Sequence, residues 1–136
     1  LCSGSGSIGI EAISRGAKRA YFVENAAKPA KCIQDNLNFT RFTDRGVLLK
    51  QDVVSALGSI HEKEADIIFM DPPYNHEFEN RVLEYLSSSP MVTEDTLIII
   101  EASKETDFDW LSDAGFHMIK EKVYKTNKHI FAGKGA

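Results

Sequence analysis

The chain has 136 residues, 43% of them hydrophobic, which is enough for one domain with its own core. No apolar run reaches the ~18 residues of a membrane span, and no charged leader precedes an apolar stretch, so we expect a cytoplasmic protein without a membrane partner. Cys2 and Cys32 lack the spacing of a metal or redox site, so we expect free thiols and no metal.

The formal net charge of −4 is unusual for an RNA-binding protein, because contacts with phosphate need Lys and Arg. Residues 1–50 carry eight basic and four acidic side chains, whereas residues 51–136 carry eight basic and sixteen acidic. A basic cluster near the C-terminus consists of Lys120, Lys122, Lys125 and Lys128. Such a cluster is more often a solvated surface than a binding site, and the sequence leaves both interpretations open.

The chain begins close to a glycine-rich turn, Gly4-Ser5-Gly6-Ser7-Ile8-Gly9, which follows only Leu1-Cys2 of a predicted strand. A turn of this kind normally follows a complete strand, so we expect the natural protein to begin earlier. Glycines let a ligand approach the backbone, and the helix predicted from Ser7 to Arg15 offers free N–H groups at its start. The turn could bind a dinucleotide pyrophosphate or the carboxylate of S-adenosylmethionine, or it could only redirect the chain.

Glu24 and Asn25 follow the strand predicted over residues 18–23. Glu24 lies twenty positions after Gly4, the interval at which an acidic side chain reaches ribose hydroxyls in a nucleotide-binding unit. The alternative is that Glu24 only places a negative charge at the start of the next helix.

That helix is predicted over residues 27–42, and we expect its Phe39 and Phe42 to lie in the core rather than to stack on bases. The strand predicted over residues 46–50 is followed by Asp52, which can cap the helix after it.

The apolar run Ala65–Met70 predicts a buried strand that must stop at Asp71-Pro72-Pro73-Tyr74, because two consecutive prolines cannot extend its hydrogen bonding. In an open parallel sheet, ligands bind at the edge where strands end. Asp71 offers carboxylate oxygens, the prolines leave carbonyls without competing N–H donors, and Tyr74 offers an aromatic face. Together these groups could hold a planar ring that bears an amino group.

The rest of the chain also alternates helix and strand. The predicted elements are a helix ending near Ser88, a buried strand Leu97–Ile100 with Glu101 at its end, a short helix at Trp110-Leu111, and a hairpin of residues 116–124 and 128–132. A structural role for the Glu101 carboxylate is as plausible as a functional one.

Asp71-Pro72-Pro73-Tyr74 resembles the (Asp/Asn)-Pro-Pro-(Tyr/Phe) signature of S-adenosylmethionine-dependent methyltransferases that act on exocyclic amino groups of nucleobases. With the opening residues 1–12 and Ser14-Arg15-Gly16-Ala17, nearly the whole chain resembles the bacterial 16S rRNA guanine-N2 methyltransferases of the RsmD type. The resemblance implies an α/β, Rossmann-like class I methyltransferase fold in one domain, residues 1–136. Its sheet would be mostly parallel and seven-stranded with an antiparallel last strand, and this chain would lack most of the first strand and a basic N-terminal extension.

The resemblance also implies a site and a partner. Cofactor-binding positions for S-adenosylmethionine, converted to S-adenosylhomocysteine, would be Ser3, Gly4, Ser5, Gly6, Glu24, Asn25, Asp52, Val53 and Asp71, with Asp52 contacting the adenine amino group. Catalytic positions would be Asp71, Pro72, Pro73 and Tyr74. Asp71 and the Pro72 carbonyl would accept hydrogen bonds from the guanine amino group, and Tyr74 would stack on the base. The partner would be 16S rRNA or an assembling small ribosomal subunit, bound by a monomer.

Three alternatives remain open. The same chemistry could act on another nucleobase amino group, such as adenine N6 in DNA. The glycine turn could belong to a nicotinamide-dependent oxidoreductase, although this leaves Asp71-Pro72-Pro73-Tyr74 without a role. The chain could also bind the cofactor without turnover.

Overall fold

The structure is a computed structural model that describes residues 6–70 and 76–135, without the side chains of residue 7 and residues 76–80. The chain divides into two compact units, Leu1–Ile60 and His61–Ala136. Within the described residues, no helix combines the length and the apolar character needed to cross a bilayer.

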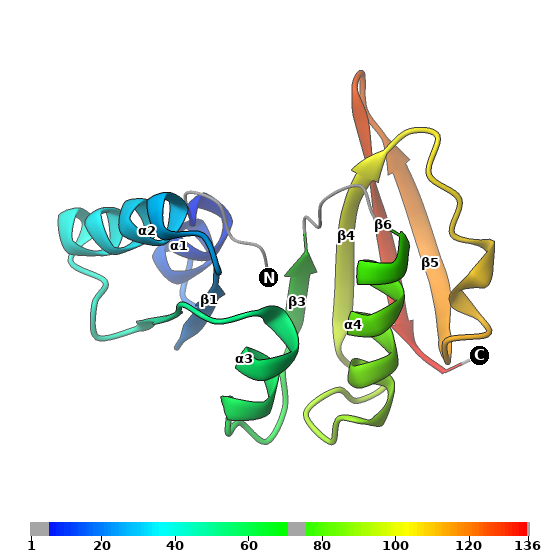
Figure 1. Ribbon diagram of the computed structural model, residues 1–136, viewed down its shortest axis with the longest axis horizontal. Coiled ribbons are helices and arrows are strands. Elements are labelled where there is room, and N and C mark those ends of the chain that lie inside the picture. Colours follow the sequence, from blue (N-terminus) through cyan, green and yellow to red (C-terminus); the bar gives the residue numbers. More distant parts are fainter. Residues whose placement is uncertain (1–5, 71–75, 136) are drawn as a thin grey trace. The chain divides into compact units, whose positions relative to one another are not determined.

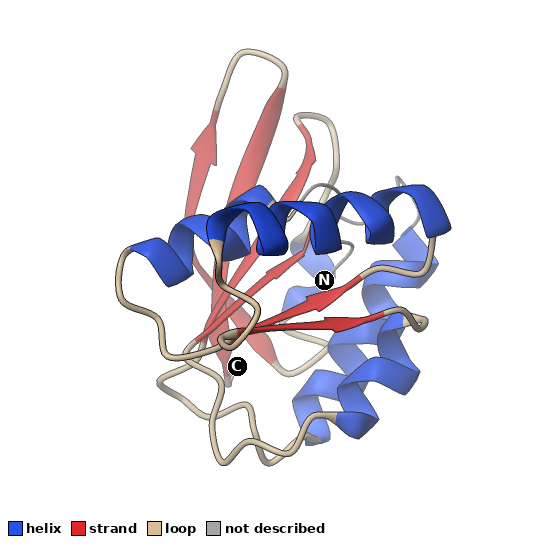
Figure 2. Cartoon of the chain, turned by 90° about the vertical axis from the view of Figure 1, so that its left-hand side faces the viewer, coloured by secondary structure: helices blue, strands red, loops and turns tan. Residues whose placement is uncertain are grey.

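The first unit alternates helices with two parallel strands (Figures 1 and 2). Its elements are α1 (Ser7–Ser14), β1 (Ala20–Val23), α2 (Ala27–Thr40), β2 (Gly46–Leu49) and α3 (Val53–Ser59). The two strands pair in register from Ala20 opposite Gly46 to Val23 opposite Leu49. Because the strands are parallel and in register, they end at the same edge of the unit.

The core of this unit forms where the helices meet the strands. Its buried side chains are Ile13, Phe22, Ile33 and Leu37, and Phe42 packs against them. Ile33 and Leu37 are four positions apart in α2, so they lie on one face of the helix.

The expectation that Phe39 lies in the core is wrong, because its side chain is 89% exposed. Two positions correspond to about 200° around a helix, so Phe39 points away from the face that carries Leu37. Phe42 lies beyond the helix end, where Arg41 adopts a left-handed conformation and the Phe42 N–H donates to the Leu37 carbonyl. This turn returns the chain to the core, as helix C-terminal caps often do.

The second unit contains a four-stranded sheet with the strand order β3-β4-β6-β5 (Figure 1). Its elements are β3 (Ile67–Met70), α4 (His76–Ser88), β4 (Leu97–Ser103), a 3₁₀ turn (Asp109–Leu111), β5 (Phe116–Val123) and β6 (Asn127–Lys134). The pair β3 and β4 is parallel, whereas β6 runs antiparallel to both β4 and β5. The predicted antiparallel last strand is therefore confirmed, and the strand expected at Leu1-Cys2 lies outside the described residues.

Burial alternates along the inner strands of this sheet. Ile98 and Ile100 of β4 and Ile130 and Ala132 of β6 are buried, while the residues between the members of each pair are partly exposed. Successive side chains of a strand point to opposite faces, so one face of the sheet is in the core and the other is more open.

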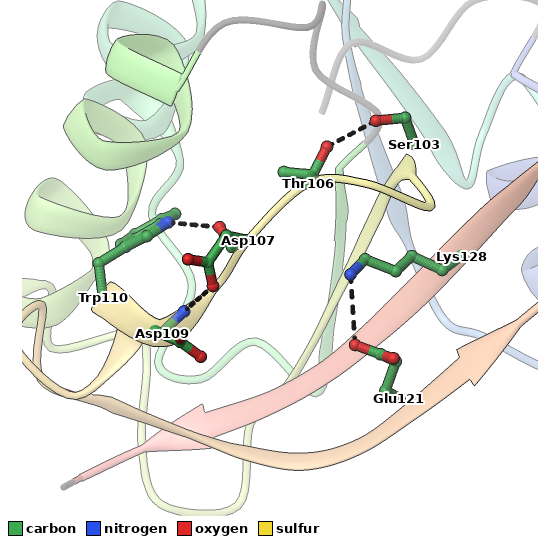
Figure 3. Close-up of polar contacts among 7 residues, drawn as sticks. All are labelled: Ser103, Thr106, Asp107, Asp109, Trp110, Glu121 and Lys128. Carbon is green, nitrogen blue, oxygen red and sulfur yellow. Dashed lines mark hydrogen bonds and ion pairs between the residues drawn. The ribbon is translucent and has the colours of Figure 1, made fainter.

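The loop between β4 and β5 is held by short-range hydrogen bonds (Figure 3). The Ser103 and Thr106 hydroxyls are 2.7 Å apart, the Trp110 indole N–H donates to the Asp107 carbonyl, and the Asp109 N–H donates to the Asp107 carboxylate. These contacts fix the chain just before the 3₁₀ turn.

Replacing Ile130 with alanine should lower the free energy of unfolding by about 2–5 kcal/mol, because the change leaves a cavity in the middle of the buried face. The matched change Ile119→Ala, on the neighbouring strand where the side chain is 56% exposed, should cost less than about 1 kcal/mol. Urea denaturation measures both, and equal losses would contradict the assigned burial.

Candidate functional site

The glycine turn requires two of its glycines for different reasons. Gly6 precedes α1 with φ 79°, a left-handed conformation that glycine adopts without strain. Gly9 lies inside α1, where a Cβ atom would come within 2.3 Å of the Phe22 ring. Phe22 is buried in β1, so α1 can pack this closely on the strand only if position 9 has no side chain.

The start of α1 presents N–H groups that the helix does not use. The first hydrogen bond of the helix runs from the Ile10 N–H to the Gly6 carbonyl, at 3.0 Å. The N–H groups of residues 7–9 therefore have no acceptor within the helix. A helix N-terminus of this kind attracts a carboxylate or a phosphate.

Glu24 follows β1 directly and takes part in the local structure there. Its N–H donates to the Leu49 carbonyl of β2, and its carboxylate accepts a hydrogen bond from the Ala26 N–H at 3.2 Å. Ala26 is the residue that precedes α2, so the side chain supports the start of that helix. Glu24 is partly buried and Asn25 is exposed.

Asp52 is the N-terminal cap of α3, as the sequence predicted. Its carboxylate accepts one hydrogen bond from the Ser55 N–H at 3.2 Å and one from the Ser55 hydroxyl at 2.7 Å. Asp52 is exposed, whereas Val53 beside it is buried.

Five of the predicted cofactor-binding residues lie within the described part of the first unit. Glu24 and Asn25 follow β1, and Asp52 and Val53 follow β2, so these four lie at the shared carboxyl edge of the two strands. Gly6 precedes the helix that leads back into β1, and an added Cβ there would lie 3.3 Å from Phe22. The edge therefore combines backbone donors with two carboxylates, a set that can bind a ligand with an anionic end and hydroxyl or amino groups.

The other predicted positions cannot be placed in the same way. Ser3, Gly4, Ser5 and the stretch Asp71-Pro72-Pro73-Tyr74 lie outside the described residues. The strand before that stretch is confirmed, because β3 ends at Met70, which is buried and paired with Ile100 of β4. The expectation that the whole strand is buried is wrong, because Ile67 at its start is 63% exposed.

A partly buried hydrogen-bonded pair of side chains lies at Glu101 of β4, one position after Ile100. Glu101 Oε1 is 2.9 Å from His129 Nε2, and these two side chains are 28% and 22% exposed. The His129 ring also makes edge contacts with Phe69, Tyr124 and Phe131. His129 was not among the predicted site residues, although its two-residue spacing from Phe131 places both on one face of β6.

The contact between Arg15 and Glu11 has no evident role in the site. The Glu11 carboxylate accepts a hydrogen bond from Arg15, one turn along α1, and raises the pKa of that guanidinium. Among the described residues, no group of three or more His, Cys, Asp and Glu side chains is arranged to hold a metal ion.

Residues 1–133 match the family described as conserved hypothetical protein 95. The chain belongs to this family. It is the RsmD family, which the motifs led us to expect.

Relatives of known name agree with this assignment. The chain is 31% identical to YlbH of Bacillus subtilis over 109 residues, which is 79% of this chain and 59% of that protein. It is 25% identical to ribosomal RNA small subunit methyltransferase D of Haemophilus influenzae over 123 residues, 89% of this chain and 63% of that protein. The chain thus spans about 60% of the length of these two relatives.

Solved structures identify the fold as Rossmann-like class I methyltransferase. A conserved hypothetical protein of Streptococcus pyogenes, 31% identical, superimposes with a TM-score of 0.85 over 97% of this chain and 81% of its own. A ribosomal protein L11 methylase of Lactobacillus delbrueckii is 14% identical and superimposes with a TM-score of 0.77 over 98% of this chain and 67% of its own.

Replacing Gly9 with alanine should lower the free energy of unfolding by about 1–3 kcal/mol, because the added methyl group overlaps the buried Phe22 ring. The matched change Gly58→Ala, in the exposed part of α3, should raise it by about 0.5–1 kcal/mol through helix propensity. Urea denaturation of both variants gives the signs, and two changes of the same sign would contradict the close packing at Gly9.

Proposed function

We propose that the protein transfers a methyl group from S-adenosylmethionine to the exocyclic N2 amino group of a guanine in 16S rRNA. The observation that carries the proposal is the position of Asp71-Pro72-Pro73-Tyr74, directly after β3, in a chain of the RsmD family. Relatives from Haemophilus influenzae and Buchnera aphidicola named ribosomal RNA small subunit methyltransferase D support the choice of substrate.

The cofactor would be held at the carboxyl edge of the first unit. The glycine turn, Ser3, Gly4, Ser5 and Gly6, would hold the carboxylate end with the N–H groups that open α1. Glu24 and Asn25 would bind the ribose, and Asp52 and Val53 the adenine. A carboxylate has about four acceptor sites, so Glu24 and Asp52 can accept cofactor hydrogen bonds while keeping those from Ala26 and Ser55.

The residues after β3 would position the substrate. The guanine amino nitrogen is a poor nucleophile because its lone pair is delocalised into the ring, whereas S-adenosylmethionine, when bound, supplies an electrophilic methyl group. The Asp71 carboxylate and the Pro72 carbonyl accept hydrogen bonds from the amino group and draw its lone pair out of conjugation. Pro73 fixes the backbone between them and Tyr74, which stacks on the base and contributes about 1–3 kcal/mol.

The bond changes then balance. The amino nitrogen forms a bond to the methyl carbon as the carbon–sulfur bond breaks, and the sulfur keeps the electron pair, which leaves S-adenosylhomocysteine. The nitrogen loses one proton to the Asp71 carboxylate, which passes it to water. A stacked guanine must first be extruded from its helix to reach these groups.

The proposed substrate also suggests where and with what partner the protein acts. The protein would act in the cytoplasm as a monomer on 16S rRNA or on an assembling small ribosomal subunit, with no metal ion in the reaction.

Replacing Asp71 with alanine should reduce methyl transfer to 16S rRNA at least ~100-fold, because the amino group loses its charged acceptor. Binding of S-adenosylhomocysteine should change little, as measured by calorimetry. The converse variant, Asp52→Asn, keeps an oxygen to cap α3 but should weaken S-adenosylhomocysteine binding.

Asp113→Asn is the control, because this exposed carboxylate lies far along the chain from both sets of residues and should affect neither quantity. Full transfer activity in the Asp71→Ala variant would refute the role assigned to this residue. Methylation of a DNA adenine in preference to rRNA would refute the substrate.

A further inference from the structure

Charge is strongly segregated within the second unit. The hairpin of β5 and β6, residues 116–134, contains five lysines and one glutamate, a net charge of +4. Residues 61–115 contain three basic and fourteen acidic side chains, a net charge of −11. A polyanion would be repelled by most of this unit, and the hairpin is the part of it that would attract one.

A β-bulge determines which face of the hairpin carries the lysines. Met118 lies opposite Ala132, but after an irregularity between Met118 and Lys120 the partners become Lys120 with Phe131 and Lys122 with His129. Opposed residues of an antiparallel pair point to the same face. The extra residue therefore turns Lys120 and Lys122 away from the buried Ala132 side and onto the open face of the sheet.

Two other charges of the hairpin, Lys128 and Glu121, pair with each other on the other face. Lys128 is buried, so the C-terminal lysine cluster is not fully solvated. The Lys128 ammonium group is 3.3 Å from the Glu121 carboxylate (Figure 3). Lys128 also lies 5.6 Å from the centre of the Phe108 ring. On the open face, the Glu101 carboxylate is paired with His129. Within the described residues, neither carboxylate forms an ion pair with Lys120 or Lys122.

Both exposed lysines lie over aromatic rings. Lys120 Nζ is 4.6 Å from the centre of the Phe131 ring, and Lys122 Nζ is 5.4 Å from that of Tyr124. An ammonium group held in this way keeps N–H donors for a further partner and has less conformational freedom to lose when it binds. Tyr124 as a residue is 39% exposed, so part of it can meet a ligand.

We propose that Lys120, Lys122, Tyr124 and Phe131, the hairpin face, form a docking surface for single-stranded RNA. The two lysines are two strand positions apart, about 6.6 Å, and contact successive phosphates, while Tyr124 stacks on a base. The choice of RNA as the ligand of this surface rests on the proposed function. A second copy of the chain would bring like charges together at the exposed β5 strand, which is unfavourable.

The test compares two double variants of the protein, Lys120→Gln/Lys122→Gln and the control Lys63→Gln/Lys104→Gln. The control removes the same charge from two exposed lysines of the same unit outside the hairpin. Fluorescence anisotropy with a labelled 20-nucleotide single-stranded RNA and with 16S rRNA gives affinity against salt concentration. The slope of log affinity against log salt concentration is negative. Losing two phosphate contacts should make it about 1.4 less steep in the hairpin variant, and the control should keep its slope.

A second pair of variants tests the stacking contact. Tyr124→Ala should weaken RNA binding about 5- to 150-fold, and Tyr124→Phe should retain most of the affinity because it keeps the ring. Calorimetry with S-adenosylhomocysteine should give the same affinity for all variants, which separates a surface effect from a folding defect.

The outcomes distinguish this inference from the proposed function. Equal salt slopes in the two double variants would overturn the docking surface even if methyl transfer to 16S rRNA is observed. RNA binding that depends on the hairpin without any methyl transfer would support the surface and refute the proposed function. Altered sedimentation of the hairpin variant with unchanged RNA affinity, or preferential binding of wild type to anionic phospholipid vesicles, would assign the face to another occupant and overturn the inference.

Discussion

The close approach of α1 to β1 at Gly9 is the constraint on which the first unit depends. An added Cβ would lie 2.3 Å from the buried Phe22 ring, so the helix can take this position only over a glycine. The helix itself begins after Gly6, which adopts a left-handed conformation, and its first N–H groups have no acceptor within the helix. Since β1 and β2 are parallel and in register, Glu24 and Asp52 follow at the shared edge. The contact at Gly9 sets how closely α1 packs on β1, and the pairing of β1 with β2 places the two carboxylates.

The second unit separates its two faces by alternation and by one irregularity. Ile98, Ile100, Ile130 and Ala132 build a buried face, and their neighbours in sequence form the open face with the Glu101–His129 pair. The bulge before Lys120 then changes which side chains of β5 share that face. A single extra residue in one strand accounts for the difference between lysines beside the core and lysines over the rings of Phe131 and Tyr124.

The sequence predicted the order and type of the elements well, because glycines, prolines and apolar periodicity act locally. The strand before Asp71, the possible cap at Asp52 and the closing hairpin were predicted from such signals, whereas the antiparallel last strand was implied by the family resemblance. The error at Phe39 was local, because two positions past Leu37 a side chain of α2 lies on the opposite side from the buried stripe. Lys128, which the sequence left open, is buried and paired with Glu121 of β5. His129 was missed because its partner Glu101 is distant in sequence and meets it only through the register of β4 and β6.

The central claim is that the glycine turn and the acidic edge of the first unit bind S-adenosylmethionine. Hydrogen exchange, measured by mass spectrometry with and without S-adenosylhomocysteine, tests it most directly because it reports on separate backbone segments. The account predicts slower exchange at the start of α1 and in the segments that contain Glu24 and Asp52, with little change in the hairpin of β5 and β6. Saturating ligand that slows exchange in the hairpin and leaves those three segments unchanged would contradict it.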